Sequence, residues 1–286
     1  MPKAGLSAGR ASGPLITHRK PFAAPYRTDI AFADFWFSFK VGGWTEWKKA
    51  RDISVIEEPP VLTIKKTMRR PTAGQIEAFQ GVSTGLVVDA MFGGGALDST
   101  IRLLTVEHDS PGVTAGPALT ADCGPADILA TLAALKFIMP GDIVVAAFSG
   151  HQGCAAIGDR VSGMMKNAGA VGFITDGPVR DYAGIVEVGL PIWCTGLTPA
   201  SPFSKGPGSV GLPIQIGGRE VETGDMVVAD RDGAVIVPHE RIDEVIQNLS
   251  KVRNLEAELD AEVAAGLKVP ESIAELLAGD QVKYVD

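Results

Sequence analysis

The sequence predicts an α/β protein with a mixed β-sheet, and three observations support that class. Between residues 142 and 194, short apolar runs alternate with stretches of helical spacing, in the order strand, helix, strand, helix, strand. Short crossovers of this kind make the three strands parallel. After Gly196, glycine and proline punctuate further short strands, and Asp232-Gly233 is a hairpin turn signal. A long helical pattern rich in Glu, Leu and Ala closes the chain.

The first 66 residues differ from the rest, so we expect an N-terminal extension over residues 1–66 and one domain over 67–286. Half of the aromatic residues, 9 of 18, lie between Phe22 and Trp47. Four of them have helical spacing and predict a helix laid against an apolar surface: Phe32, Phe35, Trp36 and Phe39.

The elements of the domain follow in order. Thr72 and Gln75 are spaced as a capping box, which predicts a helix running towards Met91, where three glycines end it. A second helix is expected from Pro125 to Ile138. The remaining elements are strands over 142–148, 171–175, 191–194, 212–216, 226–229 and 234–237, and helices over 155–168, 179–188, 240–265 and 271–277.

Composition excludes several classes of protein. The 286 residues include 26 Lys+Arg and 34 Asp+Glu, a net charge of −8, which argues against a nucleic-acid partner bound through a basic face. No apolar run approaches the roughly 20 residues that cross a bilayer. The three cysteines lack the CxxC spacing of a zinc ribbon and are odd in number. We expect a cytoplasmic protein with no membrane contact.

Two loops follow neighbouring predicted strands, at residues 149–159 and 176–181. Ligands of α/β proteins bind beyond the carboxyl ends of parallel strands, next to helix N-termini. Neighbouring parallel strands would bring the two loops side by side. Asp159, Arg180 and Asp181 are therefore candidates for one cluster.

These residue types suit the binding of an anion and a cation together. Arg180 offers a planar fork for a carboxylate, which backbone N–H groups around 158–161 would share. Asp181 suits a hard divalent cation whose other ligands are waters, as Mg²⁺ commonly accepts. The spacing leaves an alternative open, in which Arg180 and Asp181 are a surface ion pair and Asp159 is a helix-start carboxylate.

The order of these residues is distinctive. Asp159, twenty intervening residues and then Arg180-Asp181 resemble the D-X20-R-D signature of the RraA-like family, which includes 4-hydroxy-4-methyl-2-oxoglutarate/4-carboxy-4-hydroxy-2-oxoadipate aldolases. The resemblance covers roughly residues 70–280 and leaves 1–66 outside. Other segments similar to the family's core are STGLVVDAM (83–91), AGPALT (115–120), PGDIVV (140–145), ITDGPVRD (174–181), GLTPASP (196–202), GPGSVGLPIQIGG (206–218) and GDMVVADRDGAVIVP (224–238).

The resemblance implies a layered domain that assembles as a homotrimer or homohexamer. It implies a class II aldolase that cleaves a small 4-hydroxy-2-oxo diacid to pyruvate and a second oxo-acid, and that decarboxylates oxaloacetate as a side activity. Asp181 is implied to hold Mg²⁺ or Mn²⁺, and Arg180 to bind the pyruvyl carboxylate and the enolate oxygen. The loop implied to contact the substrate consists of Gly158, Asp159, Arg160 and Val161. Pro178 departs from the family, where a small residue is common.

Several alternatives remain open. The general base is Asp159 acting through a water, or an acid of a neighbouring subunit on the helix at 255–262. A Schiff-base route is disfavoured because Lys166, the only lysine between Asp159 and Asp181, lies two turns into a predicted helix.

Other family roles compete with the aldolase. The family's namesake inhibits a ribonuclease, but the metal aspartate at position 181 favours an enzyme. A methyltransferase is poorly supported, since the glycines at 93–95 follow a helix rather than a strand. Because the family is oligomeric, we expect the aromatic segment to contact a partner subunit rather than a membrane.

Overall fold

The computed structural model describes residues 36–41, 44–49, 60–104 and 112–286. The chain forms two compact units, Met1–Glu58 and Pro59–Asp286. Phe32 and Phe35, which were expected to begin an aromatic helix, lie outside the described residues. No helix among the described residues is both long enough and apolar enough to cross a membrane.

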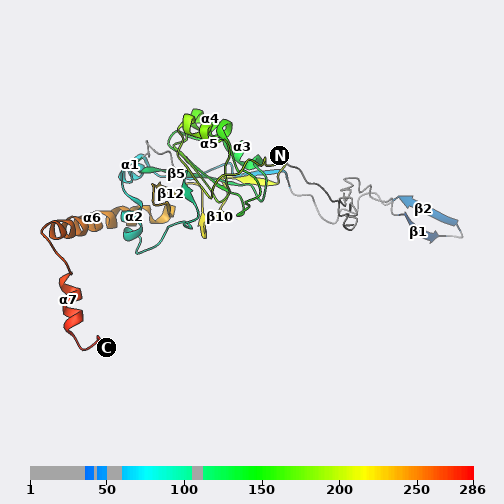
Figure 1. Cartoon of the computed structure of the whole chain (residues 1–286). Coiled ribbons are helices and arrows are strands. Elements are labelled where there is room, and N and C mark those ends of the chain that lie inside the picture. The colour runs from blue at the N-terminus through cyan, green and yellow to red at the C-terminus, as the bar shows by residue number, and fades with distance from the viewer. Residues whose placement is uncertain (1–35, 42–43, 50–59, 105–111) are drawn as a thin grey trace, which may run out of the picture. The chain divides into compact units, whose positions relative to one another are not determined.

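In the first unit the aromatic segment forms a β-hairpin, so the helix predicted there is wrong. β1 (Trp36–Val41) pairs antiparallel with β2 (Trp44–Lys49), as Figure 1 shows. Helical spacing was a poor guide, because two aromatic-rich runs flank Gly42-Gly43, and Gly-Gly is a dipeptide typical of two-residue hairpin turns.

The second unit is built on a mixed sheet of nine strands, which confirms the predicted fold class. The main path of the sheet runs β13-β12-β5-β6-β7-β8-β4, with β5 to β8 parallel to one another and β9 joining β5 to β3. The strands are β3 (Leu62–Ile64), β4 (Arg102–Leu103), β5 (Thr114–Asp122), β6 (Ile143–Ala147), β7 (Gly172–Thr175), β8 (Ile192–Cys194), β9 (Gly208–Val210), β12 (Met226–Ala229) and β13 (Ala234–Val237). A separate hairpin pairs β10 (Ile214–Ile216) with β11 (Arg219–Val221).

The helices follow the predicted order, and all but the last are shorter than expected. They are α1 (Ala73–Ala78), α2 (Thr84–Ala90), α3 (Leu129–Ala134), α4 (Asp159–Ala168), α5 (Tyr182–Val188), α6 (Ile242–Ala264) and α7 (Glu271–Ala278), with a single 3-10 turn, η1 (His239–Arg241), before α6. The helix predicted from Thr72 towards Met91 is two helices. α1 ends at Ala78, Gly81 in the turn that follows has a φ of 70°, and the Ser83 hydroxyl caps α2. The capping box of α1 is present as predicted.

Apolar side chains fill three clusters around the sheet. One lies between the sheet and α3, α4 and α5, which cover one side of it in Figure 1, and contains Phe148, Met165 and Phe173. The second includes Trp193 and side chains of the β10–β11 hairpin. The third packs α1, α2 and the start of α6 over β12 and β13. The β6-α4-β7-α5-β8 run is thereby held between two packed layers.

The central strand β5 was not predicted, because its sequence contains Gly116 and Pro117, which are rare inside strands. Both have a place in the structure. A β-carbon at position 116 would lie 2.1 Å from the carbonyl oxygen of Gly141, so the strand passes too close to the neighbouring turn for any side chain. Pro117 lies opposite Met226 of β12.

Candidate active site

The two predicted site loops meet at one edge of the sheet. β6 and β7 are parallel neighbours, so the segments that follow them leave the sheet at the same end. Backbone hydrogen bonds join the segments: Ala156 N–H donates to the Pro178 carbonyl over 2.7 Å, and Arg180 N–H donates to the Ile157 carbonyl over 3.0 Å. Gly158 is the N-cap of α4, and Asp181 is the N-cap of α5.

Arg180 and Asp181 form an open ion pair. Arg180 Nε lies 3.2 Å from Asp181 Oδ2, and the two side chains are 36% and 46% exposed. Arg180 Nη1 also donates to Ser201 Oγ over 2.5 Å. Asp181 has a φ of 62°, a left-handed conformation that aspartate tolerates better than most residues. The guanidinium is thus fixed at two of its nitrogens while the pair stays accessible.

Gly158 gives this pair its space. A β-carbon at position 158 would lie 2.5 Å from Asp181 Oδ2 and 3.2 Å from Arg180 Cγ. The backbone at 158 has a φ of −132°, which any residue can adopt. A side chain at position 158 is therefore excluded because it would collide with the ion pair, and not because the backbone conformation requires glycine.

The ion pair faces a shallow depression of about 280 Å³. Its floor and walls combine the start of α5 with the loop after β8, and its lining consists of Arg180, Asp181, Tyr182, Leu197, Thr198 and Pro199. The arrangement offers a cation, an anion and an apolar wall within one small volume. A small oxo-acid has matching features.

Asp159 and Arg160 lie in a neighbouring depression between α4 and α5, of about 460 Å³. Asp159 is the first residue of α4, and its Oδ1 accepts a 2.7 Å hydrogen bond from Arg160 N–H. A β-carbon on Gly184 would lie 2.6 Å from Asp159 Cβ, so the aspartate packs directly on α5. Val161 packs against the core behind α4. The structure thus groups Gly158 with Arg180 and Asp181, and places the side chains of Asp159 and Arg160 beside that group.

The donor set around Asp181 fits a cation that keeps most of its water. Among the described residues, no group of three or more His, Cys, Asp or Glu side chains is arranged to hold a metal. A metal at this site would therefore have the Asp181 carboxylate and water as ligands. Mg²⁺ and Mn²⁺ favour oxygen ligands, and Mg²⁺ is commonly bound through one or two carboxylates and several waters.

The cysteines do not offer a competing nucleophile. Cys123, Cys154 and Cys194 are free and buried. Burial raises the pKa of all three thiols, that of Cys123 to about 11, so the reactive thiolate is scarce at neutral pH.

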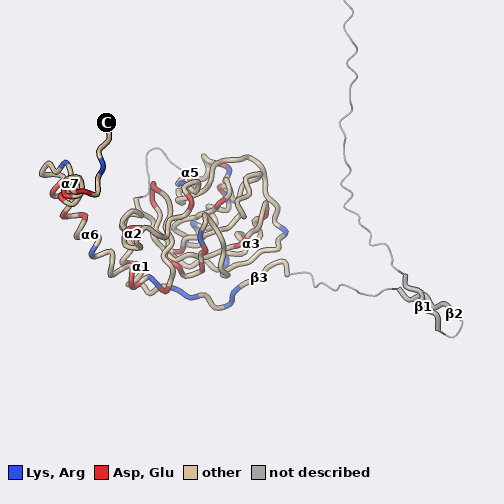
Figure 2. The backbone as a smooth tube through the Cα atoms, turned by 90° about the horizontal axis from the view of Figure 1, so that it is seen from below, with Lys and Arg blue, Asp and Glu red and all other residues tan. Residues whose placement is uncertain are grey.

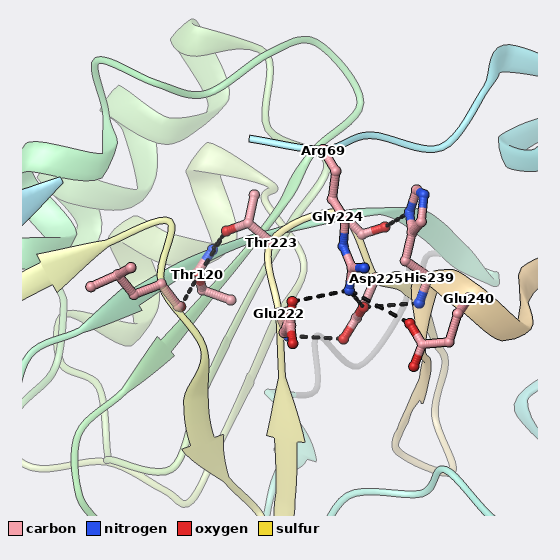
Figure 3. A network of polar contacts seen from close by, with 9 residues as sticks. Arg69, Thr120, Glu222, Thr223, Gly224, Asp225, His239 and Glu240 are labelled. Atoms are coloured by element: carbon pink, nitrogen blue, oxygen red, sulfur yellow. Dashed lines mark hydrogen bonds and ion pairs between the residues drawn. The ribbon is translucent and has the colours of Figure 1, made fainter. Parts of the chain in front are cut away.

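A second group of charged residues lies elsewhere and serves the fold. Arg69 Nη2 contacts three carboxylates, of Glu222 at 3.0 Å, Asp225 at 3.5 Å and Glu240 at 3.6 Å (Figure 3). Asp225 is buried, and this burial raises its pKa although backbone N–H groups of Glu222 and His239 bind it. These contacts tie the segment before α1 to the turn before β12 and to the start of η1.

Sequence reasoning missed the far wall of the depression. The wall consists of Leu197, Thr198 and Pro199, and Ser201 binds Arg180 close by. All four belong to the segment GLTPASP, which resembles the family but was not predicted to be part of the site. The backbone carries them there: Thr198 N–H donates to the Val179 carbonyl, and Val179 N–H donates to the Gly196 carbonyl. The position of this segment directly after a predicted parallel strand was the sequence feature that could have indicated a place in the site.

Comparison with known proteins places these residues in a family. A sequence model of the RraA-like family, described as Aldolase/RraA, matches residues 84–236, a range that contains the site. A Halalkalibacterium halodurans protein named "Putative 4-hydroxy-4-methyl-2-oxoglutarate aldolase" is 36% identical over 176 residues, which are 62% of this chain and 82% of that protein.

Solved structures share the fold. Streptomyces coelicolor RraAS2, described as an unusual member of the RNase ES inhibitor RraA protein family, is 27% identical with a TM-score of 0.59, over 68% of this chain and 100% of that one. An uncharacterized protein from Pseudomonas syringae is 22% identical with a TM-score of 0.61, over 71% of this chain and 93% of that one. With its matching segments, its mixed sheet and these relatives, the chain belongs to the RraA-like family.

Proposed function

We propose that this protein is a class II, metal-dependent aldolase that cleaves a 4-hydroxy-2-oxo diacid into pyruvate and a second oxo-acid. The observation that carries the proposal is the Arg180–Asp181 pair, held open above Gly158 and facing one depression. The aldolase name of the Halalkalibacterium relative supports the same chemistry.

Arg180 binds the carboxylate of the pyruvyl group. Its contacts with Asp181 and Ser201 fix the plane of the guanidinium and use only part of its five N–H donors. The remaining donors form a fork that suits a carboxylate. As the bond between C3 and C4 breaks, negative charge develops on the enolate oxygen, and a fixed guanidinium beside that oxygen stabilises it.

Asp181 would hold Mg²⁺ or Mn²⁺. When bound, the ion supplies Lewis-acid stabilisation of the same developing charge. The half-exposed carboxylate of Asp181 leaves room for the water ligands that such an ion keeps. The contact with Arg180 orients the carboxylate at the edge of the depression.

A base must take the proton of the C4 hydroxyl. Asp159 remains a candidate acting through a water, because its side chain lies in the neighbouring depression. An acid from a second copy of the chain is the other candidate. Loss of CO₂ from oxaloacetate produces the same enolate without a hydroxyl proton to remove, so we propose decarboxylation of oxaloacetate as a side activity.

We propose a homotrimer or homohexamer for the active form. Leu197, which lines the depression, and Phe203, further along the same segment, are 55% and 66% exposed. A second subunit covering them would close the site and bring an additional acid within reach.

The test is an assay of pyruvate release from several 4-hydroxy-2-oxo diacids and from oxaloacetate, with and without Mg²⁺ or Mn²⁺. We expect release that depends on the metal and that Asp181→Asn abolishes. Asp232→Asn, an exposed aspartate of the β12–β13 turn, is the matched control and should keep full activity. Release that persists in Asp181→Asn or in a chelator would refute the proposal.

A regulator of a ribonuclease is the second candidate, favoured by the similarity to RraAS2. The two functions predict opposite results. A regulator would release no pyruvate with any metal or substrate tested, and would inhibit a purified endoribonuclease of the RNase E type at stoichiometric concentration. An aldolase would release pyruvate and would leave the endoribonuclease uninhibited.

A further inference from the structure

α6 has two halves with very different surroundings. In the first half Ile242, Val245 and Leu249 are buried against α1, α2 and β13. From Arg253 to the end of the helix every residue is exposed, as α6 runs out beyond the sheet and its covering helices (Figure 1). The second half nevertheless carries large apolar side chains, among them Leu255, Leu259 and Val263, which are 65%, 48% and 57% exposed.

Six apolar residues of α6 follow one heptad pattern, and Leu255 lies beside it. Spacings of three and four residues place the following side chains on a single stripe: Ile242, Val245, Leu249, Val252, Leu259 and Val263. Glu256 takes the one remaining position of the repeat. A stripe of this spacing is the seam by which two helices pack in a coiled coil. The core of this chain covers the first part of the seam and leaves the second part uncovered.

Charges along the exposed half are segregated. Lys251 and Arg253 precede Glu256, Glu258, Asp260 and Glu262, so the segment changes from basic to acidic along its length. Figure 2 marks basic positions of α6 in blue and acidic ones in red. A segment of this kind complements a reversed copy of itself. Two parallel copies would instead place like charges together, with Glu256 opposite Glu256 in the seam.

We infer that the exposed half of α6 is a docking surface for the same segment of a second copy of this chain, paired antiparallel about a two-fold axis. In the register that keeps the seam closed, Val252 lies opposite Val263 of the second copy, and Glu256 lies opposite Leu259. The flanking position of Arg253 then falls beside that of Asp260, and it does so twice by symmetry.

The expected partner is a second copy of the chain, because the segment is complementary to itself. Its apolar stripe meets an identical stripe, and its basic end meets its own acidic end. A two-fold contact of this kind doubles any assembly made by the core, so that a trimer becomes a hexamer. The inference stands independently of the proposed aldolase activity.

The test measures the mass of the full-length protein by sedimentation velocity over a range of concentrations. We expect the wild type to contain an even number of chains. Leu259→Asp/Val263→Asp should halve that number, because charge enters the seam. Ala261→Asp adds one negative charge on the opposite face of the exposed helix and should leave the mass unchanged. All three positions are exposed, and equal far-UV circular dichroism would verify that the helix is intact.

A charge exchange tests the orientation. Arg253→Asp alone and Asp260→Arg alone should each raise the dissociation constant of the pairing by about tenfold or more, since each creates like-charge contacts. The double variant Arg253→Asp/Asp260→Arg should restore it. An odd number of chains in the wild type, an unchanged mass in Leu259→Asp/Val263→Asp, or a double variant as weak as the single ones would overturn the inference.

Discussion

Two Arg–Asp pairs of the second unit, Arg70–Asp142 and Arg180–Asp181, differ in almost every physical respect. Arg70 binds both oxygens of Asp142 through its two terminal nitrogens, and Met139 N–H donates to Asp142 Oδ2 over 2.9 Å. The Asp142 side chain is 0% exposed. Arg180 approaches Asp181 through Nε, and the two side chains are 36% and 46% exposed.

The difference separates a structural pair from a candidate binding pair. At Asp142 the carboxylate is saturated by protein donors, so nothing remains for a ligand. At Arg180 and Asp181 the contact fixes orientation but leaves donors and acceptors facing a depression. A buried pair is costly to break, whereas an exposed pair contributes little to stability. Substitutions should therefore affect stability at one pair and activity at the other.

The largest effect is expected at the buried pair. Asp142→Ala leaves the Arg70 guanidinium without its partner and should lower the free energy of unfolding by about 3–5 kcal/mol. Urea denaturation followed by circular dichroism measures it. Asp181→Ala is the matched substitution at the exposed pair and should change stability by less than about 1 kcal/mol. Equal losses in the two variants would remove the distinction.

At the exposed pair, Arg180→Lys should lower kcat/KM for pyruvate release by about 10²- to 10³-fold, because a lysine cannot present two parallel donors to a carboxylate. The melting temperature should stay close to that of the wild type. Arg160→Lys provides the control, since Arg160 lines the neighbouring depression. If the two arginine variants lose activity equally, the site has been assigned to the wrong depression.

Gly158→Ala sharpens the comparison without touching a charge. The new methyl group displaces the Asp181 carboxylate, and kcat/KM should fall by roughly 10- to 100-fold, as expected when a reacting group moves by about an ångström. Gly74→Ala, in α1 with open space around it, should leave activity intact and stabilise the protein slightly. Full activity in Gly158→Ala would show that the pair does not need this clearance.

Asp127 provides a third carboxylate, saturated by backbone donors instead of an arginine. Burial opposes its ionisation, but N–H groups of Lys205, Leu129 and Gly206 together lower its pKa below the ordinary 3.8. A lowered pKa adds stability above 3.8 that is lost as pH falls through the folded-state value. Asp127→Asn should cost about 1–2 kcal/mol at neutral pH. The gap to the wild type should narrow in acid, and a gap independent of pH would contradict this.

The sequence alone was sufficient for the central part of the fold. Short apolar runs bounded by glycine and proline identified β6, β7 and β8, and the helical spacing between them identified α4 and α5. The order of these elements then placed two loops at one edge, which the structure confirms through the bonds between residues 156–157 and 178–180. Local signals were enough because each element is short and clearly punctuated.

Features that depend on distant contacts were not predictable. β5 carries Gly116 and Pro117, and only the close approach of Gly141 explains the glycine. The helical spacing of the aromatic residues predicted a helix, and only the pairing of β1 with β2 shows that the chain forms a hairpin there. The wall at Leu197–Pro199 lies outside the helices and strands, and no periodicity describes the path of its backbone. Asp159 and Arg180 line different depressions because their side chains point in different directions. The spacing of residues in the sequence does not predict those directions.

The central claim is that Asp181 is the residue of this chain that holds a divalent metal, and calorimetric titration of Mn²⁺ tests it most directly. The account predicts that wild type and Asp232→Asn bind Mn²⁺ with the same affinity, and that Asp181→Asn binds it at least about tenfold more weakly at an unchanged melting temperature. Equal Mn²⁺ affinity in Asp181→Asn and wild type would contradict the account.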